Sequence, residues 1–300
     1  MRSLKWSVII AIGMFLLAAP AALGKVTENL SDETKSCLAC HRNMTPNIYE
    51  NWSRSRMSRI TPAQAKENPE LERRVSYKEL PEKYQNVVVG CAECHNMRPD
   101  KHKDTFDHQG ARVHTVVTPD DCAVCHPFER EQFSRNLMSE AHGNLENNPV
   151  YADLTQSTNG PLTFENMALS HGTPDARTSA DSCLFCHGTR LTVEKFETRY
   201  TDIGPMKFPK ISGWPNQGVG RINPDDSKGS CSACHTRHEF AIEMARKPYT
   251  CSECHKGPDV PAYKVYKVSK HANIVDSLAH GKEWDFNAVP WTAGEDFTAP

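Results

Sequence analysis

The chain has 300 residues, of which 38% are hydrophobic and 24% are charged, with a formal net charge of −2 at pH 7. This slightly acidic balance excludes nucleic acid as an expected partner, because nucleic-acid-binding domains usually present a basic face. The mean hydropathy of −0.60 indicates that the chain has too few apolar residues to bury a sufficient core by itself. We therefore expect a bound apolar group to complete the fold.

The first expected element is a secretory signal over residues 1–24. Arg2 and Lys5 form a basic start, a nearly unbroken apolar run follows, and residues 22–24, Ala-Leu-Gly, have the small side chains of a cleavage site. An uncleaved membrane anchor is the alternative, although the apolar run is short for a membrane span. We expect residues 25–300 to form one domain that is exported to the bacterial periplasm.

Helices are the regular elements that the sequence predicts most directly. Thr45 followed by Pro46 is typical of a helix N-cap and first helical residue, so a helix should run through Trp52. Thr118 and Pro119 repeat this start, with an acidic residue at the third helical position as in a capping box. Helical spacing of apolar residues predicts further helices over residues 128–141, 239–247 and 262–270.

Two long segments, residues 150–182 and 200–230, are predicted to be mainly loops. Within the second, glycines flank Trp214-Pro215-Asn216, which indicates a turn. The run of three valines at residues 87–89 is the best candidate for a strand, and it is short enough to be only a contact with a bound group. No alternating strand pattern is convincing.

All 12 cysteines lie in six copies of one five-residue motif, C-x-x-C-H, numbered here motif 1 to motif 6 in chain order. The motif attaches c-type haem: each thiol forms a thioether with a haem vinyl group, and the histidine is the proximal iron ligand. A zinc site, a redox dithiol or a disulfide framework would leave the six histidines unexplained. The predicted attachment residues are Cys37, Cys40 and His41; Cys91, Cys94 and His95; Cys122, Cys125 and His126; Cys183, Cys186 and His187; Cys231, Cys234 and His235; and Cys251, Cys254 and His255.

Six attached haems would supply the apolar surface that the composition lacks. The predicted fold class is therefore mainly α with extensive irregular loops, a multihaem cytochrome c architecture organised around stacked haems. The predicted cofactor is haem c at six sites. Motifs 5 and 6 are so close in sequence that their haems should be neighbours.

Eight histidines lie outside the motifs, and several of them should complete the coordination of iron. A low-spin haem takes a second axial ligand, which raises the expectation that a histidine in this chain binds iron. Methionine is an alternative ligand, at Met57, Met97 or Met138, although in this setting it more often packs against a haem edge. The predicted metal ligands are His108, His114, His142, His171 and His271, and the other three histidines are His102, His238 and His280.

Several stretches beyond the motifs are distinctive. Residues 213–225 read GWPNQGVGRINPD, residues 229–238 read GSCSACHTRH, and residues 254–259 read CHKGPD. A Ser-Lys-His sequence follows at residues 269–271. With these stretches the chain, from residue 36 onward, resembles the octahaem hydroxylamine oxidoreductase family of multihaem cytochromes.

The resemblance implies a trimeric periplasmic enzyme with mostly bis-histidine haems and one five-coordinate catalytic haem. That haem is the fourth in chain order, so here it would be held by Cys183, Cys186 and His187. His238 matches a histidine that the family places over the open side of this haem, where it would donate a proton or a hydrogen bond to substrate. The alternative is that His238 is an axial ligand of the fifth or sixth haem.

The chain also departs from the family. The family has eight haems and this sequence has six, and residues 291–300 match a stretch that leads into the seventh motif, so we expect the sequence to be incomplete at its C-terminus. Oxidising members carry a tyrosine farther along that cross-links to a catalytic haem, and that region is absent here. The resemblance therefore leaves open whether hydroxylamine is oxidised or nitrite and hydroxylamine are reduced.

The expected partners are a small nitrogen-oxide substrate and a redox protein, such as another cytochrome or a quinol-linked protein. Two alternatives stay open. One is a non-catalytic electron-transfer cytochrome in which every haem has two axial ligands. The other is a multihaem reductase of a different oxyanion, such as a sulfur compound.

Overall fold

The computed structural model describes residues 29–257, 260–281, 284–292 and 295–296. The expected secretory signal at residues 1–24 lies outside this range. The first part of the described chain is helical and contains α2 (Asp32–Met44), α3 (Pro46–Arg54), α4 (Pro62–Glu67) and α5 (Glu82–Gln85). Thr45 is the N-cap of α3 and Pro46 its first residue, which confirms the start predicted from these two residues.

The middle of the chain consists of short elements separated by turns. They are α6 (Cys91–His95), η1 (Pro99–Lys101), β1 (Phe106–His108), β2 (Ala111–Val113), α7 (Pro119–Cys122), α8 (Pro127–Ser134), η2 (Leu137–Glu140) and α9 (Ala141–Glu146). The prediction of one continuous helix over residues 128–141 is therefore wrong, because α8, η2 and α9 are separate elements. Asn136 is the reason, since its side chain accepts a hydrogen bond from the Met138 backbone N–H and starts a new 3-10 turn instead of extending α8.

The segment from residue 149 to residue 212 differs most from expectation. It forms α10 (Pro149–Asn159), β3 (Leu162–Glu165), β4 (Ala168–His171), α11 (Ala176–Asp181), α12 (Cys183–His187), β5 (Thr192–Thr201) and β6 (Gly204–Ser212). The prediction of loops over residues 150–182 and 200–230 is wrong for these elements. The β3 and β4 strands expose almost every side chain, so their sequences lack the alternation of apolar and polar residues that marks a half-buried strand.

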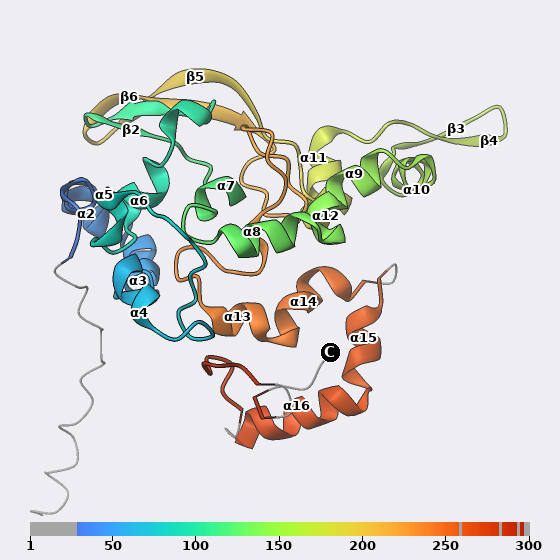
Figure 1. Ribbon diagram of the computed structural model, residues 1–300. Coiled ribbons are helices and arrows are strands. Elements are labelled where there is room, and N and C mark those ends of the chain that lie inside the picture. Colours follow the sequence, from blue (N-terminus) through green and yellow to red (C-terminus); the bar gives the residue numbers. More distant parts are fainter. Residues whose placement is uncertain (1–28, 258–259, 282–283, 293–294, 297–300) are drawn as a thin grey trace, which may run out of the picture.

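The strands pair as three separate antiparallel hairpins. The longest, β5–β6, lies along β1–β2, and the rings of Phe106 and Phe208 meet there at 5.6 Å between centroids. The β3–β4 hairpin extends away from the rest of the molecule (Figure 1). The turn expected around Trp214 is confirmed, because the Asn216 N–H donates to the Gly213 carbonyl at 3.2 Å.

The C-terminal part is again helical. It contains η3 (Cys231–Ala233), α13 (Ile242–Arg246), α14 (Pro248–His255), α15 (Ala262–Lys267) and α16 (Lys270–Gly281), and α13–α16 lie together below the rest of the chain in Figure 1. The helices predicted over residues 239–247 and 262–270 are present, but the first begins later and the second ends earlier. No helix in the described part of the chain is long and apolar enough to cross a bilayer.

The protein core is small and divided among many elements. Its least exposed apolar residues include Val88, Val116 and Ala272, which lie far apart in the sequence. Val88 is in irregular chain, and its N–H donates to the Asn29 carbonyl, so the predicted valine strand is absent. Short helices, three hairpins and many loops confirm the mainly α class with irregular connections.

Candidate haem-binding site

The six C-x-x-C-H motifs lie on or beside short helical turns. Motif 1 is within α2, motif 2 is α6, motif 4 is α12, and motif 6 ends α14, whereas motif 3 begins in α7 and motif 5 begins in η3. A helical turn brings residues i, i+3 and i+4 onto one side, so the two thiols and the imidazole of each motif face the same space. All twelve cysteines are described, and none forms a disulfide.

Three motif histidines are oriented by a bond at Nδ1. His95 Nδ1 is 2.8 Å from the His114 carbonyl oxygen, and His187 Nδ1 is 2.8 Å from the Ala141 carbonyl oxygen. His41 Nδ1 is 3.2 Å from Thr45 Oγ1. A carbonyl acceptor requires the proton on Nδ1, which leaves the Nε2 lone pair for a metal, as in most histidine ligands. The donor set of these motifs therefore fits haem iron.

The first motif also has a facing imidazole. The His41 and His108 ring centroids are 5.9 Å apart, and His108 Nδ1 is buried without a hydrogen-bond partner. Two imidazoles that bind one metal from opposite sides, at about 2 Å each, have ring centres roughly 6 Å apart. The structure thus brings the predicted ligand His108 close enough to His41 that the two imidazoles could hold the iron of a haem at motif 1.

The second motif has two neighbouring imidazoles. The His95 ring centroid is 6.1 Å from that of His114 and 6.5 Å from that of His238. His114 lies on the Nδ1 side of His95, because its carbonyl accepts the bond from Nδ1. His238 is the remaining neighbour for the Nε2 side. The geometry therefore favours His238 as the second iron ligand of a haem at motif 2. This assignment differs from both sequence-based alternatives, which were a catalytic role over the haem of motif 4 and an axial ligand of the fifth or sixth haem.

His114 does not fit the predicted role of iron ligand. Its Nδ1 is 3.0 Å from the Val116 carbonyl oxygen and its Nε2 is 2.9 Å from the Met97 carbonyl oxygen, so each ring nitrogen faces a backbone oxygen. The side chain is almost fully buried and stacks on His102, with centroids 3.6 Å apart and planes 5° apart. The structure instead places His114 behind the proximal ligand of motif 2.

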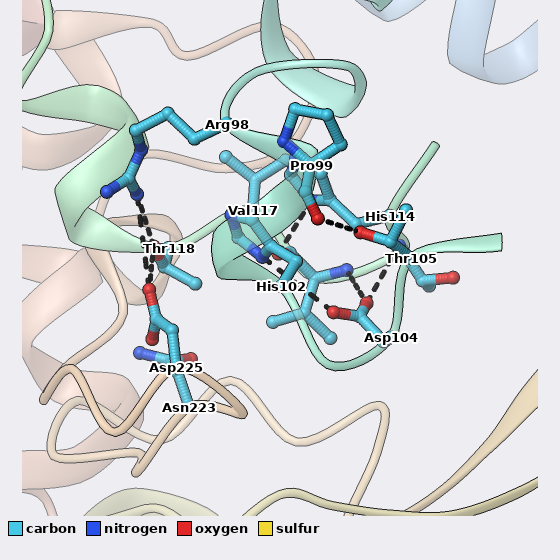
Figure 2. A network of polar contacts seen from close by, with 12 residues as sticks. Arg98, Pro99, His102, Asp104, Thr105, His114, Val117, Thr118, Asn223 and Asp225 are labelled. Carbon is cyan, nitrogen blue, oxygen red and sulfur yellow. Dashed lines mark hydrogen bonds and ion pairs between the residues drawn. The ribbon is translucent and has the colours of Figure 1, made fainter. Parts of the chain in front are cut away.

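The surrounding polar network was not anticipated (Figure 2). His102 Nε2 is 3.1 Å from Asp121 Oδ1, which also accepts from Arg98, and the Asp104 carboxylate faces His102 Nδ1 at 3.7 Å. Burial lowers the pKa of His102, but Asp104 and Asp121 outweigh it and raise that pKa to about 9. The Thr118 capping box gave the one sequence signal here, since it placed Asp121 at a helix start.

His102, His114 and Asp121 are also close enough to suggest a separate metal site. A metal ion bound by two imidazoles lies in the plane of both rings. Rings stacked 3.6 Å apart with parallel planes have no such common point. The cluster is therefore a polar support and not a metal centre.

Motif 4 is enclosed by the distinctive stretch after residue 213. Asn216 Nδ2 donates to the Leu184 carbonyl at 2.9 Å, and Asn216 Oδ1 accepts from the Thr189 and Gly218 N–H groups. The Val219 N–H donates to the Cys186 carbonyl at 2.9 Å. One asparagine thus ties both ends of the motif 4 helix to the loop.

Glycines make this close approach possible. A Cβ atom on Gly218 would lie 2.3 Å from the Gly188 nitrogen, and one on Gly220 would lie 2.6 Å from the His142 nitrogen. Gly188 itself has φ +92°, a left-handed conformation that favours glycine. The glycine-rich sequence therefore serves to pack backbone directly against the residues that follow His187.

The other predicted ligands have different settings. His142 Nδ1 is 2.6 Å from the Gly188 carbonyl oxygen, next to motif 4, so its Nε2 stays available. His171 ends β4 and has a buried Nδ1 without a partner. His271 is exposed near the start of α16. Among the described residues, none of these three rings lies beside the ring of a motif histidine. The side chain of His280 is outside the described part of the structure.

Neighbouring thiols give the spatial order of the motifs. In each neighbouring pair, one thiol raises the pKa of the other, either through a hydrogen bond or through its charge in addition to burial. For example, burial raises the pKa of Cys91 to about 12, and Cys37 adds to the rise. The pairs are Cys37 with Cys91, Cys94 with Cys125, Cys122 with Cys231, Cys234 with Cys251, and Cys186 with Cys254. The motifs therefore follow one another in the order 1, 2, 3, 5, 6, 4.

Known proteins are similar to this chain in sequence and in structure. Residues 220–298 match a family model described as "Seven times multi-haem cytochrome CxxCH". A solved "Hypothetical multiheme protein" is 46% identical, with a TM-score of 0.83 over 93% of this chain and 53% of its own. The chain is a multihaem cytochrome, and it is similar to proteins named for hydroxylamine oxidoreductase.

Two such similar proteins come from Kuenenia stuttgartiensis. A "Probable nitrite reductase-hydroxylamine oxidoreductase fusion protein" is 26% identical over 214 residues, which is 61% of this chain and 25% of the relative. A "reducing HAO-like protein complex" is 19% identical with a TM-score of 0.50, over 99% of this chain and 42% of the solved one. This multihaem cytochrome thus spans about half or less of the length of each relative, and it binds haem c.

Proposed function

We propose that this multihaem cytochrome is a periplasmic oxidoreductase of small nitrogen compounds, with substrate chemistry at motif 4 and electron transfer along the other motifs. The observation that carries the proposal is the order of the motifs. Motif 4 lies at one end of the series 1, 2, 3, 5, 6, 4, where the Cys186 thiol adjoins Cys254 of motif 6. An end position is where electrons would enter or leave a chain of haems, and at the other end, motif 1, the His108 ring already faces His41.

The protein groups at motif 4 suit a rigid reaction site. Cys183 and Cys186 would attach the haem, and His187 would bind its iron. The Ala141 carbonyl oxygen, 2.8 Å from His187 Nδ1, favours the tautomer with the proton on Nδ1. Asn216 and the close glycines hold the backbone on both sides of this histidine. Haem iron, when bound, supplies the electron exchange and the coordination position for a nitrogen ligand.

The relatives support the choice of substrate class. One is named for nitrite reduction and hydroxylamine oxidation, and the other for a reducing complex. Both directions therefore belong to the proposal, together with a redox partner of the cytochrome type. We also propose six haem sites in this chain, one for each motif, and a homo-oligomeric assembly.

Electron paramagnetic resonance of the haem-loaded protein tests the proposal. We expect at least one high-spin ferric haem whose signal changes on addition of hydroxylamine or nitrite, together with turnover of one of these compounds. A spectrum with only low-spin haems, unchanged by either compound, would contradict the proposal. It would leave the second candidate, an electron-transfer cytochrome without substrate.

That second candidate has one specific observation in its favour. Motifs 1 and 2 both have a facing imidazole, from His108 and His238, at the spacing of two axial ligands. Such sites exchange electrons without binding substrate. The spin state at the other four motifs therefore decides between the two functions.

A further inference from the structure

Two arginines flank one tryptophan in the loop that supports motif 4. The guanidinium carbon of Arg221 is 5.7 Å from the centre of the Trp214 ring, and that of Arg237 is 5.2 Å from it. Both arginines thus lie within cation–π distance of the same side chain. The two positive charges therefore share one aromatic neighbour, and each lies within 6 Å of the centre of its ring.

Arg221 is a buried cation without a carboxylate partner. It is 2% exposed, and its guanidinium donates to Asn223 Oδ1 at 2.7 Å and to the Asn216 carbonyl at 3.1 Å, both of which are neutral. Burial, and after it the charge of Arg237, lowers the pKa of Arg221 to about 10. A buried charge is costly unless an opposite charge compensates for it.

The nearest acid is already committed elsewhere. Asp225 acts on Arg221 only at a distance, because its carboxylate accepts from Thr118 Oγ1 at 2.9 Å and from Ser227 Oγ at 2.5 Å. It also approaches Arg98 at 4.0 Å. Among the described residues, neither Arg221 nor Arg237 forms an ion pair, so the pair has a surplus of positive charge.

The position of the pair indicates which anion would compensate for it. Arg221 Nη2 donates to the Val117 carbonyl at 3.4 Å, just before the helix of motif 3, and the Arg221 carbonyl accepts from the Gly229 N–H at 2.7 Å, just before motif 5. Arg237 follows motif 5 and precedes His238, whose ring centroid is 6.5 Å from that of His95 of motif 2. Three motifs therefore meet around the two guanidinium groups. Each attached haem carries two propionate carboxylates, and a planar guanidinium binds a carboxylate through parallel hydrogen bonds.

We propose that Arg221 and Arg237 form a clamp for a carboxylate at the junction of motifs 2, 3 and 5, that this carboxylate is a haem propionate, and that the clamp raises the reduction potential of that haem. Two fixed positive charges stabilise the reduced form of the haem, which carries one positive charge fewer at iron. The inference rests on haem attachment at these motifs and does not depend on the chemistry at motif 4.

Potentiometric titration of the haem-loaded protein, followed by absorbance and electron paramagnetic resonance, tests the clamp. Arg237 is the residue to change, because it is more exposed than Arg221. In Arg237→Gln we expect one haem to titrate at a lower potential, or one haem to be lost in a haemochrome assay. Arg237→Lys keeps the charge and should largely restore the wild-type titration.

A matched control is Arg199→Gln, since Arg199 also lies over an aromatic ring, that of Phe208 at 5.5 Å, but on the β5–β6 hairpin. This variant should titrate as the wild type. If Arg237→Gln keeps every haem and its titration superimposes on that of the wild type, the clamp is overturned.

The same chemistry would also hold a soluble oxyanion, and added nitrite or phosphate separates the two sources. A wild-type titration that is independent of both anions supports the propionate. A saturable shift that Arg237→Gln abolishes would assign the clamp to a free anion and overturn the propionate assignment. Turnover of hydroxylamine and nitrite is measured separately, so a failure of the proposed function leaves the titration result interpretable.

Discussion

A single hydrogen bond decides which side of the His95 imidazole is available to iron. The His114 carbonyl occupies Nδ1, and His238 is the neighbour that remains for Nε2. The sequence singled out His238 as a candidate site residue, but a contact between residues so far apart in the chain cannot be read from local spacing. The same holds for His114, whose contacts with two backbone oxygens are visible only in the folded chain.

We expect His238→Ala to convert one haem from low spin to high spin without loss of haem, because the proximal attachment at motif 2 is unchanged. Electron paramagnetic resonance of the ferric protein measures the conversion. The neighbouring variant Thr236→Ser alters an exposed residue and should leave all spin states as they are. An unchanged spectrum in His238→Ala would return His238 to the list of catalytic candidates.

Asp104 offers a test of the support behind motif 2. Its carboxylate is fully buried, accepts from the Thr115 and Val116 N–H groups at 2.9 and 2.8 Å, and faces His102, whose pKa it raises. Asp104→Asn removes the negative charge beside His102, and breaking such a buried pair typically costs about 3–5 kcal/mol of stability. Denaturant unfolding of the haem-loaded protein should show this loss.

Asp107→Asn on β1 is the control for this variant, because Asp107 is exposed and its loss should change the unfolding free energy little. Equal unfolding midpoints for Asp104→Asn and Asp107→Asn would mean that His102 is not charged in the folded protein.

At the scale of elements, local sequence signals predicted where helices begin better than they predicted how long the helices are. Thr45-Pro46 and the Thr118 capping box mark true helix starts, because a cap depends only on adjacent residues. The three hairpins were missed because their strands are largely exposed and bury little against a common core. The motif 4 loop was recognised as a turn, but its close packing against Gly188 depends on residues thirty positions apart.

Gly218→Ala tests that packing. The new Cβ would meet the Gly188 backbone at 2.3 and 2.4 Å, and backbone atoms cannot move aside without displacing the residues after His187. We expect one haem fewer per chain, measured by haemochrome assay and intact mass. Gly143→Ala in helix α9 is the matched control, since its Cβ would meet only side chains, that of Asn147 at 3.3 Å and that of Glu140 at 3.9 Å. A full haem complement in Gly218→Ala would contradict the supporting role of this loop.

At the scale of the whole molecule, the composition anticipated a small core, and the structure has one. Large apolar side chains are exposed in many places, among them Leu137, Tyr200 and Val268, each at least 80% exposed. Their number follows from a chain that folds around bound groups and neighbours instead of around its own side chains alone. The position of these exposed side chains could not be predicted, because it depends on elements that the sequence did not reveal.

Several of the exposed apolar side chains lie together on the β3–β4 hairpin. Leu162, Phe164, Met167 and Leu169 are 61%, 66%, 87% and 59% exposed on a hairpin that projects from the body of the molecule. An apolar arm of this kind is stable in water when another protein surface covers it, and a second copy of the chain is the occupant that fits the homo-oligomer proposed above.

We expect Phe164→Ser together with Leu169→Ser to reduce the molar mass measured by light scattering after size exclusion. Tyr200→Ser, at the equally exposed tip of β5–β6, is the control and should keep the wild-type mass. A wild-type protein that is already monomeric, or a double variant of unchanged mass, would show that the arm does not join copies of the chain.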